Sequence, residues 1–153
     1  MAKHTVAGTT IGISASVPAT FDEAGYEAVN FTLIGNISDG GEHGRVYNEV
    51  TFNPIDDRGT QKFKGSFNEG TKTLQIGYDS ADAGMVLLKT ALNSDNDFSF
   101  EVTYPNGDID WFQAKVMSVS KATGSVDSMM TASVTLSITT NDAGVGIVEY
   151  LET

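Results

Sequence analysis

The residue types that most often carry chemistry in proteins are sparse in this sequence and lie far apart. There are two histidines, His4 and His43, and no cysteine. Zinc sites need several such ligands at short spacings, which two distant histidines do not provide. Asp95-Asn96-Asp97 has the composition of part of a calcium-binding loop, but the glycine and the closing glutamate are missing at the required offsets. We therefore expect no metal and no other cofactor, and we interpret both histidines as exposed polar residues.

Two aspartates are the best candidates for acid–base chemistry. Asp108 and Asp110 flank a predicted turn, and residues two apart on a strand share one face, as a catalytic carboxylate pair requires. The same spacing is also typical of a solvated strand end. The sequence contains neither a G-x-S-x-G nucleophile motif nor a phosphate-binding G-x-x-x-x-G-K-[ST] loop. We predict that the protein is not an enzyme, and a small hydrolase using these aspartates remains a rival hypothesis.

Aromatic side chains suggest a second rival, a carbohydrate-binding β-sandwich module. Trp111, Tyr104 and Tyr78 would form its platform, since flat aromatic faces stack on apolar faces of sugars. Such a module would be a monomer that its sugar stabilises. An aromatic residue beside a hairpin turn belongs more often to a core or an interface, so we keep this module as the alternative function.

Composition restricts the class of protein further. The chain has 153 residues, of which 40% are apolar, and this suits one domain spanning residues 1–153. Nine basic and 20 acidic residues give a net charge of −11, which argues against sequence-reading nucleic-acid binding and against docking to anionic membranes. No apolar run approaches the ~20 residues of a membrane span, and no apolar segment follows the first residues as a secretory signal would.

Alternation of apolar and polar residues with period two dominates the sequence and predicts antiparallel strands. Residues 130–139 alternate apolar side chains with serine and threonine. Residues 98–104 and 109–119 also alternate, and the turn Pro105-Asn106-Gly107-Asp108 predicts that they pair as a hairpin, because Asn-Gly supplies the positive φ angles of tight turns. Further strands are predicted at residues 11–17, 29–33, 50–52, 62–67 and 74–78, with a hairpin turn at Asn68-Glu69-Gly70-Thr71.

One segment has helical periodicity instead. Ala81, Met85, Leu88 and Leu92 recur at spacings of four, three and four, which predicts a helix over 80–92 with Asp79 or Ser80 as its N-cap. The sequence therefore predicts a mainly β fold: an antiparallel β-sandwich or barrel with one α-helix packed on the sheet and a long loop.

Two segments match neither pattern well. Residues 35–60 are rich in glycine and aspartate, and loops of this length are usually functional or disordered. We expect residues 38–60 to be mobile in the free subunit. Residues 141–153 begin with a flexible Asn-Asp-Ala-Gly and then become apolar. We expect this C-terminal arm to pack on an adjacent subunit, and the alternative is one more edge strand of the same domain. Its apolar residues are Val145, Ile147, Val148, Tyr150 and Leu151.

The order of these elements carries a resemblance. Early strands that open with residues 9–14 precede the long loop, the turn at residues 68–71 and the single helix. The paired strands 98–104 and 109–119 and the Thr/Ser-alternating strand 129–140 then complete the chain. In this order and length the sequence resembles the tail tube proteins (major tail proteins) of long-tailed, siphovirus-type bacteriophages, over nearly the whole chain.

The resemblance implies a structural function. Members of this family form hexameric rings that stack into a tube, and their inner strands join into one β-barrel around a channel for DNA. It implies that the chain acts in the virion tail, after assembly in the host cytoplasm and away from any membrane. The implied partners are further copies of the chain, the tape-measure protein, and the tail terminator and tail tip proteins. Double-stranded DNA would pass through the lumen without specific binding, which agrees with the acidic net charge.

The same resemblance assigns roles to residues. The polar face of the strands 98–104, 109–119 and 129–140 is expected to line the lumen, with candidates Glu101, Thr103, Gln113, Lys115, Thr131, Ser133, Thr135 and Ser137. Lys115 is the one cation among them, and we expect it to pair with an acid such as Glu101. The loop 38–60 is expected to bridge stacked rings, through Arg45, Val46, Tyr47, Val50, Phe52 and Arg58.

Overall fold

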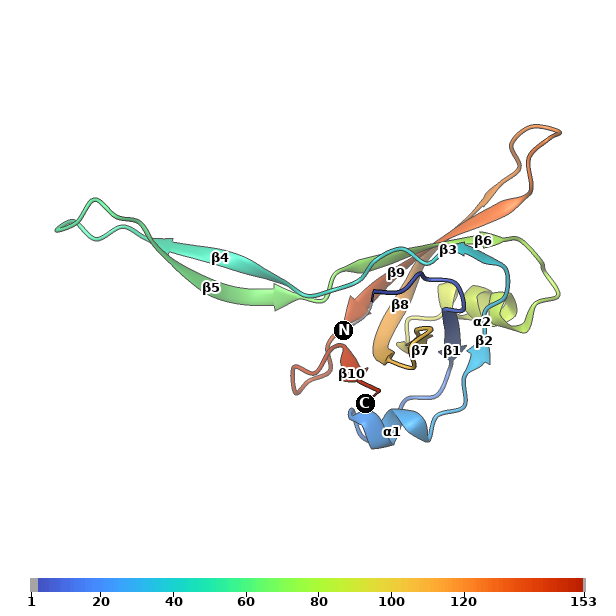
Figure 1. The fold of residues 1–153 in the computed structure, drawn as a ribbon, viewed down its shortest axis with the longest axis horizontal. Helices are drawn as coiled ribbons and strands as arrows, with labels where there is room; N and C mark the ends of the chain where they lie inside the picture. The colour runs from blue at the N-terminus through green and yellow to red at the C-terminus, as the bar shows by residue number, and fades with distance from the viewer. Residues whose placement is uncertain (1–2, 153) are drawn as a thin grey trace.

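The structure, a computed structural model, describes residues 3–152 and is organised around one curled antiparallel sheet (Figure 1). Its strands lie in the order β2-β1-β7-β8-β9-β6-β3, and β10 also pairs with β8. The sheet curls because β2 and β3, at opposite ends of this order, are separated by only three residues of chain. In chain order the elements are β1 (Thr10–Ser14), α1 (Glu23–Glu27), β2 (Thr32–Leu33), β3 (Ile37–Asp39), β4 (Val46–Phe52), β5 (Gln61–Asn68), β6 (Thr71–Gly77), α2 (Ala83–Leu92), β7 (Phe98–Thr103), β8 (Ile109–Ala122), β9 (Thr131–Thr139) and β10 (Val148–Tyr150).

The predicted fold class is confirmed, and strands form where apolar and polar residues alternate in the sequence. Along β9 every second residue is buried, because alternate side chains of a strand point to opposite faces. The predicted hairpin of residues 98–104 and 109–119 is also present, with Phe100 opposite Phe112 and Gly107 at a φ of 97° in the turn. The buried faces of these strands build the core together with Ile11, Ile13, Leu74 and Ile76.

Helix α2 packs on the inner face of the curled sheet and closes the core. Met85 and Leu88 are fully buried, as the helical periodicity predicts. The helix begins later than predicted, because the Asp82 carboxylate accepts a hydrogen bond from the Met85 amide and caps it. The same carboxylate accepts from the Gly35 amide, so it also holds the turn between β2 and β3 against the helix.

A second helix, α1, escaped the sequence analysis because it is only five residues long. Asp22 caps it through the Gly25 amide. Gly25 is needed here, since any larger side chain would collide with the Thr20 carbonyl. The chain from Ala15 to Phe31, with α1 inside it, lies across the outer face of β1, β7 and the first half of β8. One half of the sheet therefore has both of its faces covered.

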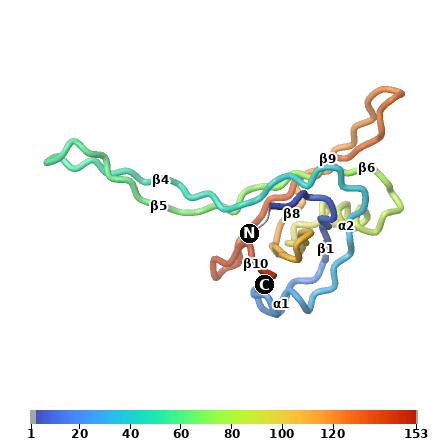
Figure 2. Tube along the Cα trace, in the orientation of Figure 1, coloured from blue at the N-terminus to red at the C-terminus, as the bar shows by residue number. Residues whose placement is uncertain are grey.

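The predicted long loop is largely a β-hairpin. Strands β4 and β5 pair only with each other and extend far from the sheet, and we call residues 45–68 the long hairpin (Figure 2). The predicted turn at residues 68–71 is wrong, because β5 belongs to the long hairpin whereas β6 pairs with β9 and β3. Gly70, at a φ of 86°, instead redirects the chain from the long hairpin into the sheet.

The C-terminal segment forms an edge strand, which was the alternative to an arm in the sequence-based expectation. Val148, Glu149 and Tyr150 form β10, an edge strand on β8 of the same domain. Ile147 packs against the core, whereas Leu151 remains 63% exposed. The prediction that this segment is an arm packed on an adjacent subunit is therefore wrong for residues 147–150. Alternation over three residues is too short a signal to separate an arm from a strand.

The two faces of α2 provide a test of the fold. We expect Leu88→Asp to prevent folding or to yield aggregates, because it places an unpaired charge in the core. Val86→Asp is the matched control, since Val86 lies on the same helix and is 51% exposed. It should leave the melting temperature within a few degrees of the wild type. Equal melting temperatures for the two variants, measured by circular dichroism, would contradict the packing of α2.

Candidate functional site

The outer face of β6, β9 and the second half of β8 is an open surface lined by hydroxyl groups. Cross-strand neighbours form rows on it: Thr71, Ser137 and Lys115 are one row, and Gln75, Ser133 and Ser120 are another. We call this surface the hydroxyl face, and it comprises Thr71, Thr73, Gln75, Lys115, Ser118, Ser120, Thr131, Ser133, Thr135, Ser137 and Thr139. Its serine and threonine side chains are part of the polar half of the alternation that buries Val134 and Leu136 on the other side.

The hydroxyl face carries almost no charge. Lys115 is the one ionised side chain among its residues, and its ammonium group pairs with the Asp97 carboxylate at the end of the preceding strand. The expected pairing with Glu101 is not formed. Gln75 donates a hydrogen bond to Ser133 at 3.1 Å, so neighbouring polar groups partly satisfy each other. Thr131, Ser133, Thr135 and Ser137, four of the predicted lumen residues, therefore lie together on a neutral surface.

The remaining lumen candidates lie on the other half of the sheet. Gln113 is only 4% exposed and donates to the Ser99 hydroxyl at 2.7 Å and to the Tyr26 hydroxyl at 3.1 Å. Glu101 accepts a hydrogen bond from the Trp111 indole at 2.8 Å. The segment containing α1 covers this region, so the assignment of Gln113 and Glu101 to a lumen is wrong. Thr103 shares the face of Glu101 and is half-buried.

The aromatic platform of the carbohydrate-binding alternative is not formed. Trp111 is 1% exposed and stacks on Tyr26 with ring centroids 5.8 Å apart. Tyr104 and Tyr78 are engaged elsewhere, Tyr104 with Asp110 and Tyr78 with Lys89. A buried indole cannot stack on a sugar, so these three residues form no platform for that function.

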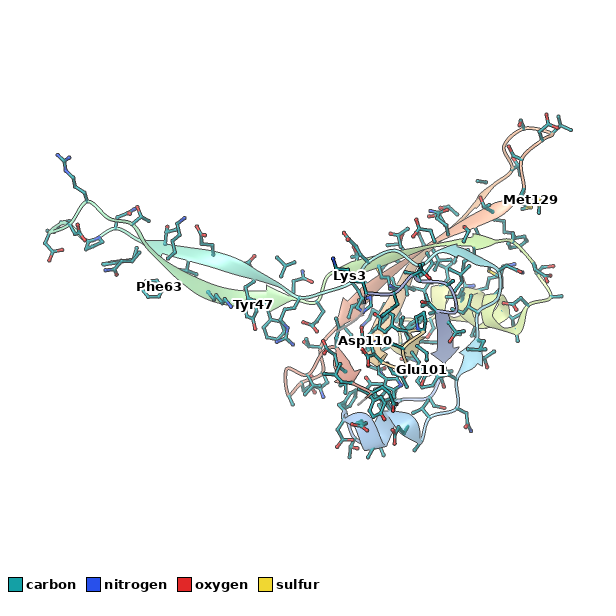
Figure 3. All side chains as sticks on the ribbon, in the orientation of Figure 1. Lys3, Tyr47, Phe63, Glu101, Asp110 and Met129 are labelled. Atoms are coloured by element: carbon teal, nitrogen blue, oxygen red, sulfur yellow. The ribbon has the colours of Figure 1, made fainter. Side chains whose placement is uncertain are left out.

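The long hairpin has two faces of opposite character, set by the register of its strands. Val50 is opposite Phe63, and Val46 and Phe52 point to the same side of β4 as Val50, so one face is apolar. Lys62 and Lys64, opposite Thr51 and Glu49, lie on the other face. The register shift between Tyr47 and Glu49 places Tyr47 and Phe67 on this second face too, and Lys64 Nζ lies 4.9 Å from the centroid of the Tyr47 ring. Figure 3 shows Tyr47 near the root of the long hairpin and Phe63 further along it, outside the body of the subunit. The apolar face is exposed to solvent along its length: Val50 is 50%, Phe52 57% and Phe63 55% exposed.

Charge is distributed unevenly between the long hairpin and the rest of the chain. Residues 45–68 contain four of the nine basic residues but only three of the 20 acidic residues. The long hairpin therefore has a net charge of +1, and the remainder of the chain has −12. Arg45 lies at its root, on the face of Phe67 with 3.9 Å between the guanidinium carbon and the ring centroid. Arg58 lies at the exposed tip.

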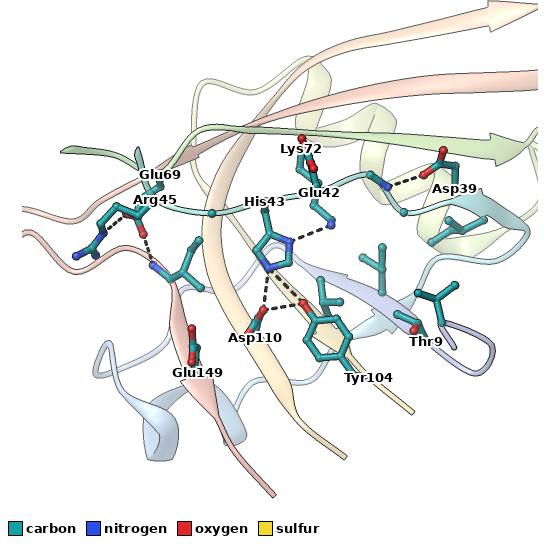
Figure 4. A pocket seen from close by; sticks show the side chains of 18 of the residues that line it. Thr9, Asp39, Glu42, His43, Arg45, Glu69, Lys72, Tyr104, Asp110 and Glu149 are labelled. Atoms are coloured by element: carbon teal, nitrogen blue, oxygen red, sulfur yellow. Dashed lines mark hydrogen bonds and ion pairs between the residues drawn. The ribbon is translucent and has the colours of Figure 1, made fainter. Parts of the chain in front are cut away.

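A polar network lies where the long hairpin joins the body, and it consists of His43, Lys72, Tyr104 and Asp110 (Figure 4). The Asp110 carboxylate is 2.8 Å from His43 Nε2 and accepts from the Tyr104 hydroxyl at 2.7 Å. Lys72 Nζ is 3.0 Å from His43 Nδ1. Because an ammonium group can only donate, His43 Nδ1 accepts from Lys72, and Nε2 faces the Asp110 carboxylate as a donor.

The positions of His43 and Lys72 differ from what the sequence predicted. The His43 side chain is only 10% exposed, so its interpretation as an exposed residue is wrong. Lys72 is 3% exposed and occupies an inward position of β6, in line with Leu74 and Ile76. A lysine at an inward position of an alternating strand is the one signal in the sequence that could have indicated this network.

Burial and hydrogen bonding shift the pKa values of this network in opposite directions. Burial lowers the pKa of Lys72, although Asp110 and Asp39 oppose this effect. For Asp110, burial acts to raise the pKa, but hydrogen bonds from His43 and Tyr104 outweigh it and hold the pKa below its ordinary value. Burial and the Asp110 carboxylate raise the pKa of Tyr104. The ionised carboxylate is therefore the favoured acceptor at the centre of the network.

Asp108 and Asp110 do not act as a carboxylate pair. Asp108 accepts from the Glu152 amide and the Asn106 side chain, whereas Asp110 is bound within the polar network. Within residues 3–152 no group of three or more His, Cys, Asp or Glu side chains could hold a metal ion. None of the helices in that range has the length and apolarity to cross a membrane.

Comparison with known proteins identifies the family. The model of the family described as "Lambda phage tail tube protein, TTP" matches residues 25–144, and the chain therefore belongs to that family. It is a structural tail tube subunit of the virion tail and not an enzyme. No curated protein matched the sequence significantly.

Solved structures share the fold at low sequence identity. The tail tube of the phage SPP1 is 16% identical with a TM-score of 0.67, covering 97% of this chain and 80% of that one. The sheath/tube terminator of PVC, an extracellular contractile injection system, is 10% identical with a TM-score of 0.66 and covers 99% of both chains. The tail of an empty GTA particle gives 11% identity and a TM-score of 0.61, covering 94% of this chain and 96% of that one.

The polar network predicts a pH-dependent contribution to stability. Asp110→Asn should lower the free energy of unfolding at pH 7 by about 1 kcal/mol, after allowance for solvent screening of a half-buried group. Because the folded-state pKa of Asp110 is lowered from 3.8, this contribution is complete above that pH and disappears as the pH falls further. The difference in free energy of unfolding between Asp110→Asn and the wild type should therefore become smaller as the pH falls below 3.8. Asp127→Asn, at an exposed position, should have the wild-type free energy of unfolding at every pH. A loss of stability for Asp110→Asn that stays constant down to pH ~2 would contradict the network.

Proposed function

We propose that this chain forms hexameric rings that stack into a tube, and that the hydroxyl face lines its lumen. The observation that carries the proposal is an extended sheet face that is open, polar and nearly uncharged on an otherwise acidic subunit. Six-fold symmetry is supported by the structural relative in the GTA tail, which is described with C6 symmetry. Cyclic rings repeat one head-to-tail contact, so the neighbours of every subunit are further copies of this chain.

A hydroxyl-rich wall is suited to the passage of DNA. Proteins that hold DNA do so mainly with lysine and arginine at the phosphates, and release of counterions makes that binding strong. On the hydroxyl face the single cation, Lys115, is already paired with Asp97. Serine and threonine hydroxyls stay hydrated and offer no ionic contact. We propose that double-stranded DNA slides along this wall without specific binding, and that the tape-measure protein occupies the lumen before ejection.

The long hairpin is proposed to bridge stacked rings. Full burial of a large apolar side chain stabilises by ~1.5–3 kcal/mol, so covering the apolar face of the long hairpin would contribute several kcal/mol per subunit. Its net charge of +1 complements the charge of −12 on the body of another copy. At the two ends of the tube the same surfaces would meet the tail terminator and tail tip proteins.

The lumen assignment is tested by adding charge to the hydroxyl face. Ser133→Lys would place a ring of free cations on the wall, and particles carrying it should eject DNA more slowly, most strongly at low salt, where screening is weakest. Thr90→Lys is the control, since Thr90 is exposed on α2 and away from this face. Fluorescence assays of genome release measure both variants. Wild-type ejection by Ser133→Lys particles at every salt concentration would overturn the assignment.

The role of the long hairpin is tested by removing apolar area that the free subunit does not bury. Phe63→Ser should leave the melting temperature of the subunit unchanged, because Phe63 is 55% exposed, but it should shorten the tubes seen by negative-stain microscopy. Val17→Ser removes an equally exposed side chain outside the long hairpin and should not change tube length. Tubes of normal length from Phe63→Ser subunits would argue against an inter-ring contact.

A further inference from the structure

A buried carboxylate connects the root of the long hairpin to the C-terminal segment. Glu69 lies between β5 and β6 and is only 2% exposed. It accepts a hydrogen bond from Arg45 Nε at 2.6 Å, and Arg45 is the residue directly before β4 (Figure 4). Its second oxygen accepts from the Ile147 amide at 2.7 Å, directly before β10. Among residues 3–152, the segments of these two donors make no other side-chain hydrogen bond or ion pair with each other.

The surroundings of this carboxylate fix its position. Gly146 packs directly against it, and any side chain at that position would displace Glu69. On the opposite side, the Arg45 guanidinium also contacts the Phe67 ring and donates to the Tyr47 hydroxyl, so it joins both strands of the long hairpin at their root. The Ile147 amide and the Arg45 guanidinium are thus held at fixed positions around the Glu69 carboxylate.

The energetics make the two contacts interdependent. An ionised carboxylate is costly to bury unless its oxygens are satisfied, and loss of one partner leaves much of that cost uncompensated. If Arg45 withdraws, Glu69 is drawn toward water and its bond to Ile147 weakens. If the C-terminal segment withdraws, the carboxylate is hydrated and its hold on Arg45 relaxes.

From this geometry we infer that Glu69 is a positioning residue that couples the direction of the long hairpin to the seating of β10. The root of the long hairpin and residues 145–150 then open and close as one unit. A subunit presents a fixed hairpin to its neighbours only while its C-terminal segment is docked. The consequence for tube growth rests on the proposed inter-ring role of the long hairpin, whereas the coupling is a property of the single subunit.

Hydrogen exchange of the isolated subunit tests the coupling. Arg45→Gln should accelerate exchange of the amides at residues 147–150 by about tenfold or more, since a hydrogen bond to a charged group is lost from the shared carboxylate. Arg45 is partly exposed, so this variant is expected to fold. Truncation after Gly144 should accelerate exchange at residues 45–47 reciprocally. Lys115→Gln, which breaks the Lys115–Asp97 pair on another face, should change neither segment.

The outcomes separate the coupling from the proposed function. Faster exchange confined to the root of the long hairpin in Arg45→Gln, with residues 147–150 unchanged, would overturn the coupling. Acceleration of both segments supports it, whatever the tubes look like. If both segments are accelerated and Arg45→Gln tubes still reach normal length, the coupling holds and the inter-ring role of the long hairpin is rejected instead.

Discussion

The geometry of the subunit depends on one strand, β8, because its fourteen residues are paired along nearly their whole length. Its first half pairs with β7 on one edge and with β10 on the other, and its second half pairs with β9. Since side chains alternate strictly between faces, a shift of one residue would expose Phe112 and bury Lys115. The irregularity between Val116 and Ser118 adds one residue to β8 and shifts the phase of this alternation, so that Val119 points inward in the second half of the strand.

Continuous pairing of β8 divides its outer face into two environments. The first half carries Trp111 and Gln113 into the layer beneath α1, where the Trp111 indole donates to Glu101 and the Gln113 amide nitrogen donates to Ser99 and Tyr26. The second half carries Lys115, Ser118 and Ser120 to the hydroxyl face. A single strand thus contributes core side chains on one face, and on its other face it has a covered half and an open half. This division explains how a chain of 153 residues can present a broad open surface and still bury enough apolar area to fold.

The sequence predicted those elements whose signals lie within a short stretch of chain. Alternation predicted β7, β8 and β9, and the Asn-Gly turn predicted the hairpin of β7 and β8. The spacing of Met85 and Leu88 predicted α2. The same alternation could not distinguish the two halves of the outer face, because the covering segment is specified by contacts such as Tyr26 on Trp111, 85 residues apart in the numbering. For that reason Gln113 and Ser133 looked equivalent in the sequence. The positions of Glu69 and His43 also depend on partners distant in the chain. Much of the long hairpin was expected to be a loop because it has no buried face, and without one it lacks most of the apolar alternation that marks a strand.

The pairing of β4 and β5 has a consequence for the subunit before assembly. Each of these strands pairs only with the other in the described structure, so both outer edges of the ribbon carry unpaired backbone donors and acceptors. Such edges invite identical ribbons to join side by side without limit. Lys62 and Lys64 place charged side chains on the β5 edge, and the extra residue of β5 between Lys64 and Phe67 interrupts its regular pairing. These two features disfavour the joining of identical ribbons edge to edge, so the long hairpin can stay exposed on a free subunit without acting as a template for unlimited strand pairing.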